Sequence, residues 1–265
     1  MSTAAGNSAH ERVEARFSLR VGDGVLHAAA VVPAGRTTLT QLLPVIQNLE
    51  NAIVGHVAQG AAEAGQPISC GPGCGACCRQ MVPVSLFEAE ALMDWLRSLP
   101  EERRRELEQR FHRALTALHE AGVLERILDQ NWMDEKEHTT QLALDYFRVG
   151  VPCPFLEEES CSIHPIRPLS CREYLVTSPK DFCRDPAANS VAGVQLPLKL
   201  SRALYAFGQR LENDRRGWIP LVFLLAWGRS GVRPGDSVAD GGEAMLKGFL
   251  EQVMGLPPEE ETAVQ

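Results

Sequence analysis

The sequence predicts a mainly α protein, a single helical domain with a small N-terminal β hairpin and a proline-rich, cysteine-bearing loop ordered by metal. Apolar residues recur at helical spacing over most of the chain, and only one stretch, near the N-terminus, has the signature of a hairpin. Six prolines between positions 152 and 186 interrupt the helical pattern and forbid long helices there. With 265 residues, 45% of them hydrophobic, the chain can bury a sizeable core.

The N-terminal part is predicted to contain the hairpin and one long helix. Residues 1–15 are small and polar without periodicity, so we expect them to be disordered. Two β-prone runs, 16–21 and 25–32, flank the Asp23-Gly24 step, which favours a tight turn. A helix is expected from Thr38 to about Ala64, because apolar residues recur four, three and four positions apart, at Leu42, Ile46, Leu49 and Ile53. Hairpin and helix form a predicted unit over 16–67.

A helical insert is predicted over 85–148, inside a cysteine-bearing domain over 68–190. Ser85 and Glu88 have the spacing of a capping box, and Pro100 separates the first helix of the insert from the second. The expected core residues of the later helices are Leu107, Phe111, Leu115, Leu118, Leu128, Trp132, Leu142, Leu144 and Phe147. Residues 150–190 form a loop that needs something to order it.

Helices return after the loop. Three are expected over 198–211, 217–229 and 242–255, packing as a C-terminal unit over 191–256, and Pro220 would begin the second of them. Residues 257–265 are predicted to form an acidic tail. No strand pair other than the N-terminal hairpin is expected.

Charge and hydropathy exclude several classes of protein. A net charge of −8 argues against a general nucleic-acid binder, and the basic run 103–105 lies among glutamates, as on a solvated helix face. The longest apolar run, 218–227, is about half of the ~20 residues that span a bilayer, and the N-terminus lacks the apolar core of a secretory signal. We therefore expect a cytoplasmic protein without membrane partners, in which cysteines serve metal rather than disulfides.

The most specific signal is a set of eight cysteines in two blocks, predicted to be metal ligands: Cys70, Cys74, Cys77, Cys78, Cys153, Cys161, Cys171 and Cys183. Thiolate is a soft ligand that selects zinc or iron–sulfur centres, and four thiolates complete either one. We interpret the blocks as two halves of one Zn²⁺ or Fe site, a [4Fe–4S] cluster being one form of it. The i, i+3, i+4 spacing of Cys74, Cys77 and Cys78 would put them on one helical turn. Eight cysteines also allow two four-ligand sites, or one site with spare thiols, and the adjacent Cys77 and Cys78 favour a cluster or two centres.

Three arginines beside cysteines, Arg79, Arg167 and Arg172, are candidates for cofactor binding, because their charge would offset that of a thiolate-bound metal. Arg172, directly after Cys171, is the first choice among them. His164 is open to two interpretations, a metal ligand or a hydrogen-bonding loop histidine. Cys183 is either a ligand or a buried apolar thiol.

These blocks resemble the YkgJ-type family of CxxCxxCC cysteine-cluster proteins, described as zinc- or iron-chelating domains. The matching residues are Cys70, Cys74, Cys77-Cys78, Pro152-Cys153-Pro154-Phe155-Leu156, Cys161 to His164, and Arg167 to Arg172. The resemblance covers 70–175 and implies a metal site built from both blocks. The family often has tyrosine where His164 stands, and Cys183 lies outside the matched pattern. A related domain occurs in a flagellin lysine methylase, which implies that some members are enzymes.

The predicted function is therefore a metal-binding protein that holds zinc or iron, with an unknown protein partner. The alternative is a redox or S-adenosylmethionine-dependent transferase-type enzyme that uses an iron–sulfur cluster. The spacing of Cys70, Cys74 and Cys77 also matches radical S-adenosylmethionine enzymes, but the alternating strand–helix pattern of their barrel does not follow. A nucleophilic pair of Cys161 and His164 is weaker still, because adjacency in sequence is poor evidence for a catalytic dyad.

Overall fold

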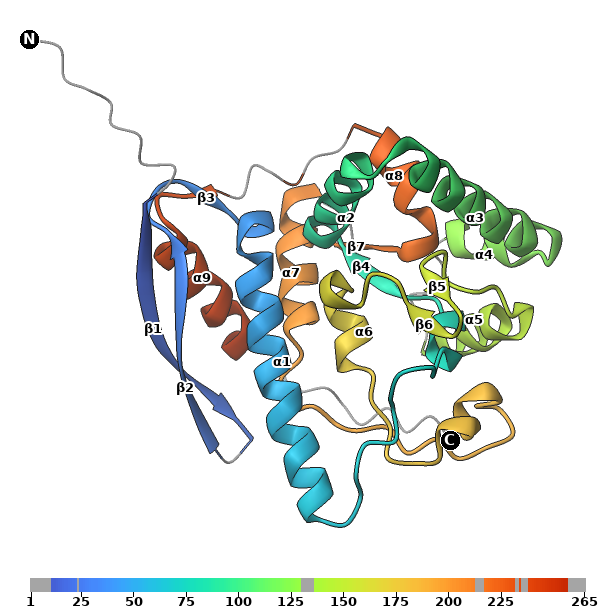
Figure 1. Ribbon diagram of the computed structural model, residues 1–265, viewed down its shortest axis with the longest axis horizontal. Coiled ribbons are helices and arrows are strands. Elements are labelled where there is room, and N and C mark those ends of the chain that lie inside the picture. Colours follow the sequence, from blue (N-terminus) through green and yellow to red (C-terminus); the bar gives the residue numbers. More distant parts are fainter. Residues whose placement is uncertain are drawn as a thin grey trace, which may run out of the picture.

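Helices make up most of the protein, as the fold class predicts. A computed structural model describes residues 11–22, 24–129, 136–212, 217–231, 234 and 238–256 (Figure 1). The α-helices are α1 (Leu39–Glu63), α2 (Leu86–Ser98), α3 (Glu101–Glu120), α4 (Val123–Asp129), α5 (Lys136–Val149), α6 (Leu169–Glu173), α7 (Leu200–Glu212), α8 (Leu224–Arg229) and α9 (Gly242–Gly255). Short 3₁₀ turns are η2 (Ala76–Arg79), η4 (His164–Ile166), η5 (Lys180–Arg184) and η6 (Leu221–Phe223).

The N-terminal hairpin is confirmed, and it is longer than predicted. Strands β1 (Arg12–Val21) and β2 (Gly24–Pro33) pair antiparallel, and Gly22, with φ of +57°, takes up the turn. The expected disorder over 1–15 is wrong from Arg12 onward, because charged and apolar residues already alternate there and Ala15 is buried. Residues 1–10 and Asp23 lie outside the described part of the chain.

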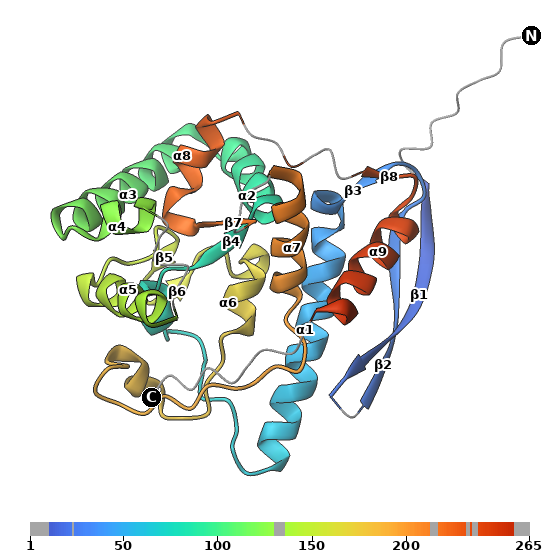
Figure 2. The ribbon, with the colours of Figure 1, turned by 180° about the vertical axis from the view of Figure 1, so that it is seen from behind.

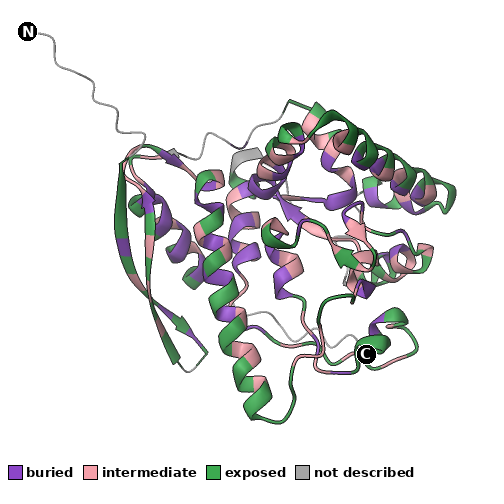
Figure 3. Cartoon of the chain, in the orientation of Figure 1, coloured by how far each residue is buried: buried purple, intermediate pink, exposed green. Residues whose placement is uncertain are grey.

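One core contains residues of the hairpin and of α1, α7 and α9, together with Phe87 of α2 and Leu169 of α6. Helix α9 lies between the hairpin and α1, and α7 packs beside them (Figures 1 and 2). The residues predicted to line the inner face of α1 are all buried: Leu42, Ile46, Leu49 and Ile53. Thr38 and Gln41 close a capping box at the start of α1, which fixes where the helix begins. The second half of α1 extends beyond this core and is largely exposed (Figure 3).

The helical insert forms a second layer on the other side of α6. The predicted capping box of Ser85 and Glu88 is present at the start of α2. Pro100 occupies the N-cap of α3, and the basic run on that helix forms ion pairs, as Arg103 does with Glu106 at 2.6 Å. Leu128 is 60% exposed, so its predicted place in the core is wrong, and the buried residue of this turn is Ile127. Trp132 lies outside the described ranges.

Three short strand pairs contradict the expectation that the hairpin stands alone. They are β4 (Pro83–Ser85) with β7 (Trp218–Pro220), β3 (Thr37–Thr38) with β8 (Val238–Ala239), and β5 (Leu156–Glu157) with β6 (Ser160–Cys161). The predicted helix over 217–229 is consequently wrong in its first part, where β7 and η6 precede α8. Strands of two or three residues carry no periodicity, and their partners are distant in sequence, so a local pattern does not reveal them.

Within the described ranges, no helix is both long and apolar enough to cross a bilayer. The predicted acidic tail over 257–265 lies outside those ranges.

Candidate metal centre

The first cysteine block folds as a tight turn followed by η2. Gly73 has φ of +78°, a left-handed conformation that favours glycine. A Cβ on Gly75 would lie 2.6 Å from Oε2 of Glu159 and 2.9 Å from Cδ1 of Leu156, so a larger residue would require both side chains to shift. The prediction that Cys74, Cys77 and Cys78 share one α-helical turn is wrong, because the turn is 3₁₀ and begins after Cys74. Consecutive residues on a 3₁₀ turn are about 120° apart around its axis, so the side chains of Cys77 and Cys78 leave the backbone in different directions.

The second block places three cysteines on separate short elements. Cys153 precedes the β5–β6 hairpin, Cys161 ends β6, and Cys171 lies on α6. The backbone N–H of Phe155 donates to the Cys153 sulfur, and that of Ile163 donates to the Cys161 sulfur. Backbone donors of this kind orient and stabilise thiolate ligands.

The two blocks are bonded to each other, although about 75 residues separate them in sequence. The backbone N–H of Cys153 donates to the carbonyl of Cys78 at 2.7 Å. The Arg79 guanidinium makes a bidentate ion pair with Glu159, at 2.7 and 3.1 Å, and donates to the Gly75 carbonyl at 2.9 Å. The helical insert therefore folds back and returns the chain to the first block, as the convergence of the blocks requires.

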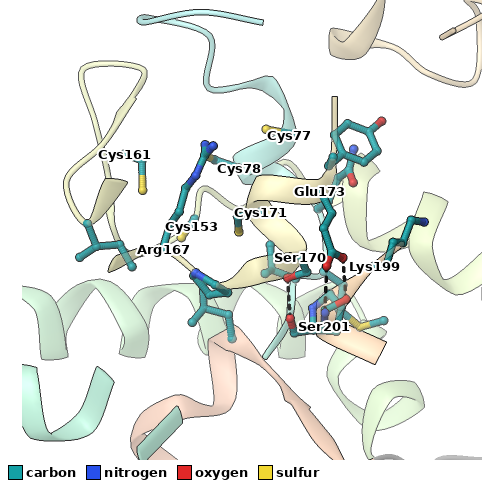
Figure 4. A pocket seen from close by; sticks show the side chains of 18 of the residues that line it. Cys77, Cys78, Cys153, Cys161, Arg167, Ser170, Cys171, Glu173, Lys199 and Ser201 are labelled. Carbon is teal, nitrogen blue, oxygen red and sulfur yellow. Dashed lines mark hydrogen bonds between the residues drawn. The ribbon is translucent and has the colours of Figure 1, made fainter. Parts of the chain in front are cut away.

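One cavity of about 310 Å³ collects cysteines from both blocks. Its wall contains five of the eight: Cys77, Cys78, Cys153, Cys161 and Cys171. Figure 4 shows these thiols on one side of the cavity, and Glu173, Lys199 and Ser201 on the other. All eight cysteines of the chain are free thiols in the structure.

The remaining three cysteines form a separate group beside η2. Cys70, Cys74 and Cys183 pack together with Ala76, Val176 and Val191. Cys183, carried by η5, is only 3% exposed. The structure thus brings it next to two cysteines of the first block, a contact that its position in the sequence does not reveal.

The thiols strongly influence each other's protonation. A hydrogen bond from the Cys78 thiol lowers the pKa of Cys77 to about 7, and the same bond raises the pKa of Cys78. Burial raises the pKa of Cys153 to about 12 and that of Cys171 well above its ordinary range. Several neutral thiols therefore surround one that ionises readily. A soft dication could replace their protons, because coordinated thiols are deprotonated.

The cysteine sulfur atoms of the described residues are not arranged around a common point. Across the described ranges, no three Cys, His, Asp or Glu side chains already stand at metal-ligand spacing. A cysteine sulfur moves by rotation about a single torsion, χ1, between staggered positions. Side-chain rotation, together with the short loops that carry these cysteines, is the adjustment that ligation would require.

The three candidate arginines have three different environments. Arg167 lines the cavity, and its buried Nε has no hydrogen-bond partner among the described residues. Arg172 is 4% exposed and donates to the carbonyls of Arg167 and Pro165 and to the side chain of Asn51. Arg79 pairs with Glu159 and does not line the cavity. His164 is exposed at the start of η4, and the charge of Arg167 lowers its pKa.

Sequence reasoning missed a group of buried carboxylates beneath α6. Glu88 accepts from the Leu169 N–H at 2.7 Å, at the start of α6. Glu173 accepts from the N–H and hydroxyl of Ser201, at 2.9 and 2.5 Å, at the start of α7. Glu50 accepts from the Leu200 N–H at 3.3 Å. These carboxylates accept from the free backbone N–H groups at the starts of α6 and α7, although they are distant from them in sequence. In the sequence, the one sign that such an acid is buried is the position of Glu50 among the apolar residues of α1.

Glu50 should make stability depend on pH. Burial, with the charge of Glu173, raises its pKa from 4.5 to about 9. Between pH 4.5 and about pH 9, Glu50 holds a proton in the folded state that it has lost in the unfolded state, so the free energy of unfolding falls as pH rises. We expect Glu50→Gln to increase the free energy of unfolding by about 1–3 kcal/mol at pH 8 and to change it little at pH 4.

Urea denaturation across this range measures the effect, with Glu63→Gln, an exposed position on the same helix, as the control. A difference between the wild type and Glu50→Gln that does not vary with pH would contradict the prediction.

Comparison with known proteins agrees with this site. Residues 69–188 match the model of the CxxCxxCC family, whose description is "putative zinc- or iron-chelating domain". Neither the curated proteins nor the solved structures yield a match to the chain. The match begins just before Cys70 and ends after Cys183, so it includes both groups of cysteines. The similarity to the CxxCxxCC family thus covers the cysteine-bearing segment, residues 69–188 of the 265.

Proposed function

We propose that the protein binds zinc or iron through thiolates contributed by both cysteine blocks. The observation that carries this proposal is the cavity, whose wall contains five thiols from the two blocks. Lining a cavity with that many half-buried thiols has no structural benefit by itself, since close packing of side chains ordinarily fills such space. The family described as zinc- or iron-chelating supports the same class of ligand.

The residues fit such a metal in charge as well as in chemistry. Four thiolates around a dication leave a formal charge of about −2. The buried Nε of Arg167, without a partner in the described chain, is a donor that an anionic metal–thiolate centre would satisfy. Bound zinc would supply structural order, whereas bound iron would add electron transfer.

The test is the metal content of the wild-type protein, purified without oxygen. We expect stoichiometric zinc in a colourless protein, or iron in a brown protein with acid-labile sulfide. Protein that lacks both metals and takes up neither on reconstitution would refute the proposal.

The same reduced thiols support a cytoplasmic location, because an oxidising compartment would convert them to disulfides.

A second candidate function is redox or transferase chemistry at the same centre. It is favoured by the room in the cavity, which continues past the thiols to polar side chains, among them Lys199, Ser201 and Tyr205. For iron-loaded protein, this candidate predicts bleaching of the visible spectrum by dithionite, or binding of S-adenosylmethionine in equilibrium dialysis. If neither occurs, the protein only holds the metal.

A further inference from the structure

The eight cysteines divide into two sets of four in the structure. We propose that the protein holds two metal centres, one formed by Cys70, Cys74, Cys77 and Cys183, and one formed by Cys78, Cys153, Cys161 and Cys171. This inference rests on the proposed function and goes beyond it, because it replaces one shared site by two. Four thiolates are a complete ligand set for tetrahedral zinc, and also for one iron–sulfur cluster.

The first centre is built where η5 packs against η2. Cys70, Cys74 and Cys183 are in one contact group, and none of the three lines the cavity that the other five share. Hydrogen bonds hold the two segments together here, from the Ser69 N–H to the Val176 carbonyl at 2.9 Å and from the Ser69 hydroxyl to the Ser178 carbonyl at 2.5 Å. The Val176 N–H in turn donates to the Cys70 sulfur, which gives this group its own backbone donor.

The second centre is built inside the cavity. Cys153 precedes β5, Cys161 ends β6 and Cys171 lies on α6. The Cys78 carbonyl accepts from the Cys153 N–H, which joins the first block to this group. Among the cysteines, Cys78 is within electrostatic reach of Cys153 and Cys171, in addition to its neighbour Cys77. Arg167, on the same wall, supplies the positive charge for this centre.

The adjacent pair Cys77 and Cys78 lies at the boundary between the two groups. Neighbouring residues on a 3₁₀ turn diverge by about 120°, so one mononuclear ion is poorly placed to bind both. Cys77 is within electrostatic reach of Cys70 and Cys183 on one side, and of the three second-block cysteines of the cavity on the other. Assigning Cys77 to the first group and Cys78 to the second gives each group its fourth thiolate.

The experiment is zinc loading of metal-free protein under reducing, oxygen-free conditions, read by elemental analysis and native mass spectrometry. We expect two zinc ions per wild-type chain. Cys183→Ser and Cys161→Ser should each retain one, and the double variant should retain none. Cys74→Ser serves as a second variant of the first centre, in case Cys183→Ser impairs folding, which far-ultraviolet circular dichroism would detect.

Two results would overturn the inference while leaving the proposed function intact. In the first, the wild type binds one zinc ion, and Cys183→Ser and Cys74→Ser bind it equally well, so that only the cavity holds metal. In the second, either single variant loses all of its zinc, which means that the thiols form one shared site. A wild-type chain that binds no metal would refute the proposed function itself.

Discussion

Removing the metal from the wild-type protein should make residues 174–199 the first segment that trypsin cleaves. Between α6 and α7 this segment has little regular structure beyond η5, and its buried side chains are few: Val176, Ser178, Cys183 and Leu196. If metal is present at about 1,000 times its dissociation constant, its binding contributes about 4 kcal/mol to stability. Losing that contribution raises the population of the open segment, and with it the cleavage rate, by up to about 10³-fold.

Cleavage should occur at Lys180 and Arg184, both exposed, and mass spectrometry of the fragments identifies the sites. Arg105, exposed on the well-packed helix α3, is the internal control, and its cleavage should hardly change with chelator. Equal digestion of the 174–199 segment with and without metal would show that metal does not order it.

Arg172→Ala should destabilise the protein by about 3–5 kcal/mol, the cost of removing one partner from a buried charged network. The guanidinium donates to three groups, at 3.1, 2.8 and 2.7 Å, and is within electrostatic reach of the buried Glu88 and Glu50. Alanine would leave the three acceptors unsatisfied and would remove a positive charge that favours ionisation of Glu88 and Glu50. Urea denaturation measures the loss.

The matched control is Arg184→Ala, which removes an exposed arginine whose ion pair with Asp181 spans 3.3 Å, and which should change stability by less than about 1 kcal/mol. The measurement should be repeated on metal-free protein. A loss at Arg172→Ala that disappears without metal would indicate that this arginine acts on the metal, as the sequence alone had indicated, and not on the surrounding fold.

Local signals made much of the fold predictable. The hairpin, helix α1 and the capping box of α2 each depend on residues close together in sequence, and the structure confirms all three. The strand pair β4–β7 was missed because Val84 and Ile219 meet only after the intervening chain has folded. No periodicity within either segment encodes that contact.

The candidate site was predictable in its composition but not in its arrangement. Thiol chemistry and spacing indicated that the two blocks converge, and the structure places Cys78 against Cys153. How the cysteines divide depends on the direction of each sulfur from a 3₁₀ turn, which spacing does not specify. The three candidate arginines likewise look alike in sequence, yet among them only Arg167 lines the cavity, whereas Arg172 is buried and Arg79 pairs with Glu159.

Helix α6 is only five residues long, yet it carries Cys171 toward the cavity and Glu173 toward the start of α7. A displacement of this helix would therefore disturb the thiol wall and uncap α7 in the same movement. Metal binding to the thiols of the cavity and the packing of α7 against α6 would thus be thermodynamically linked.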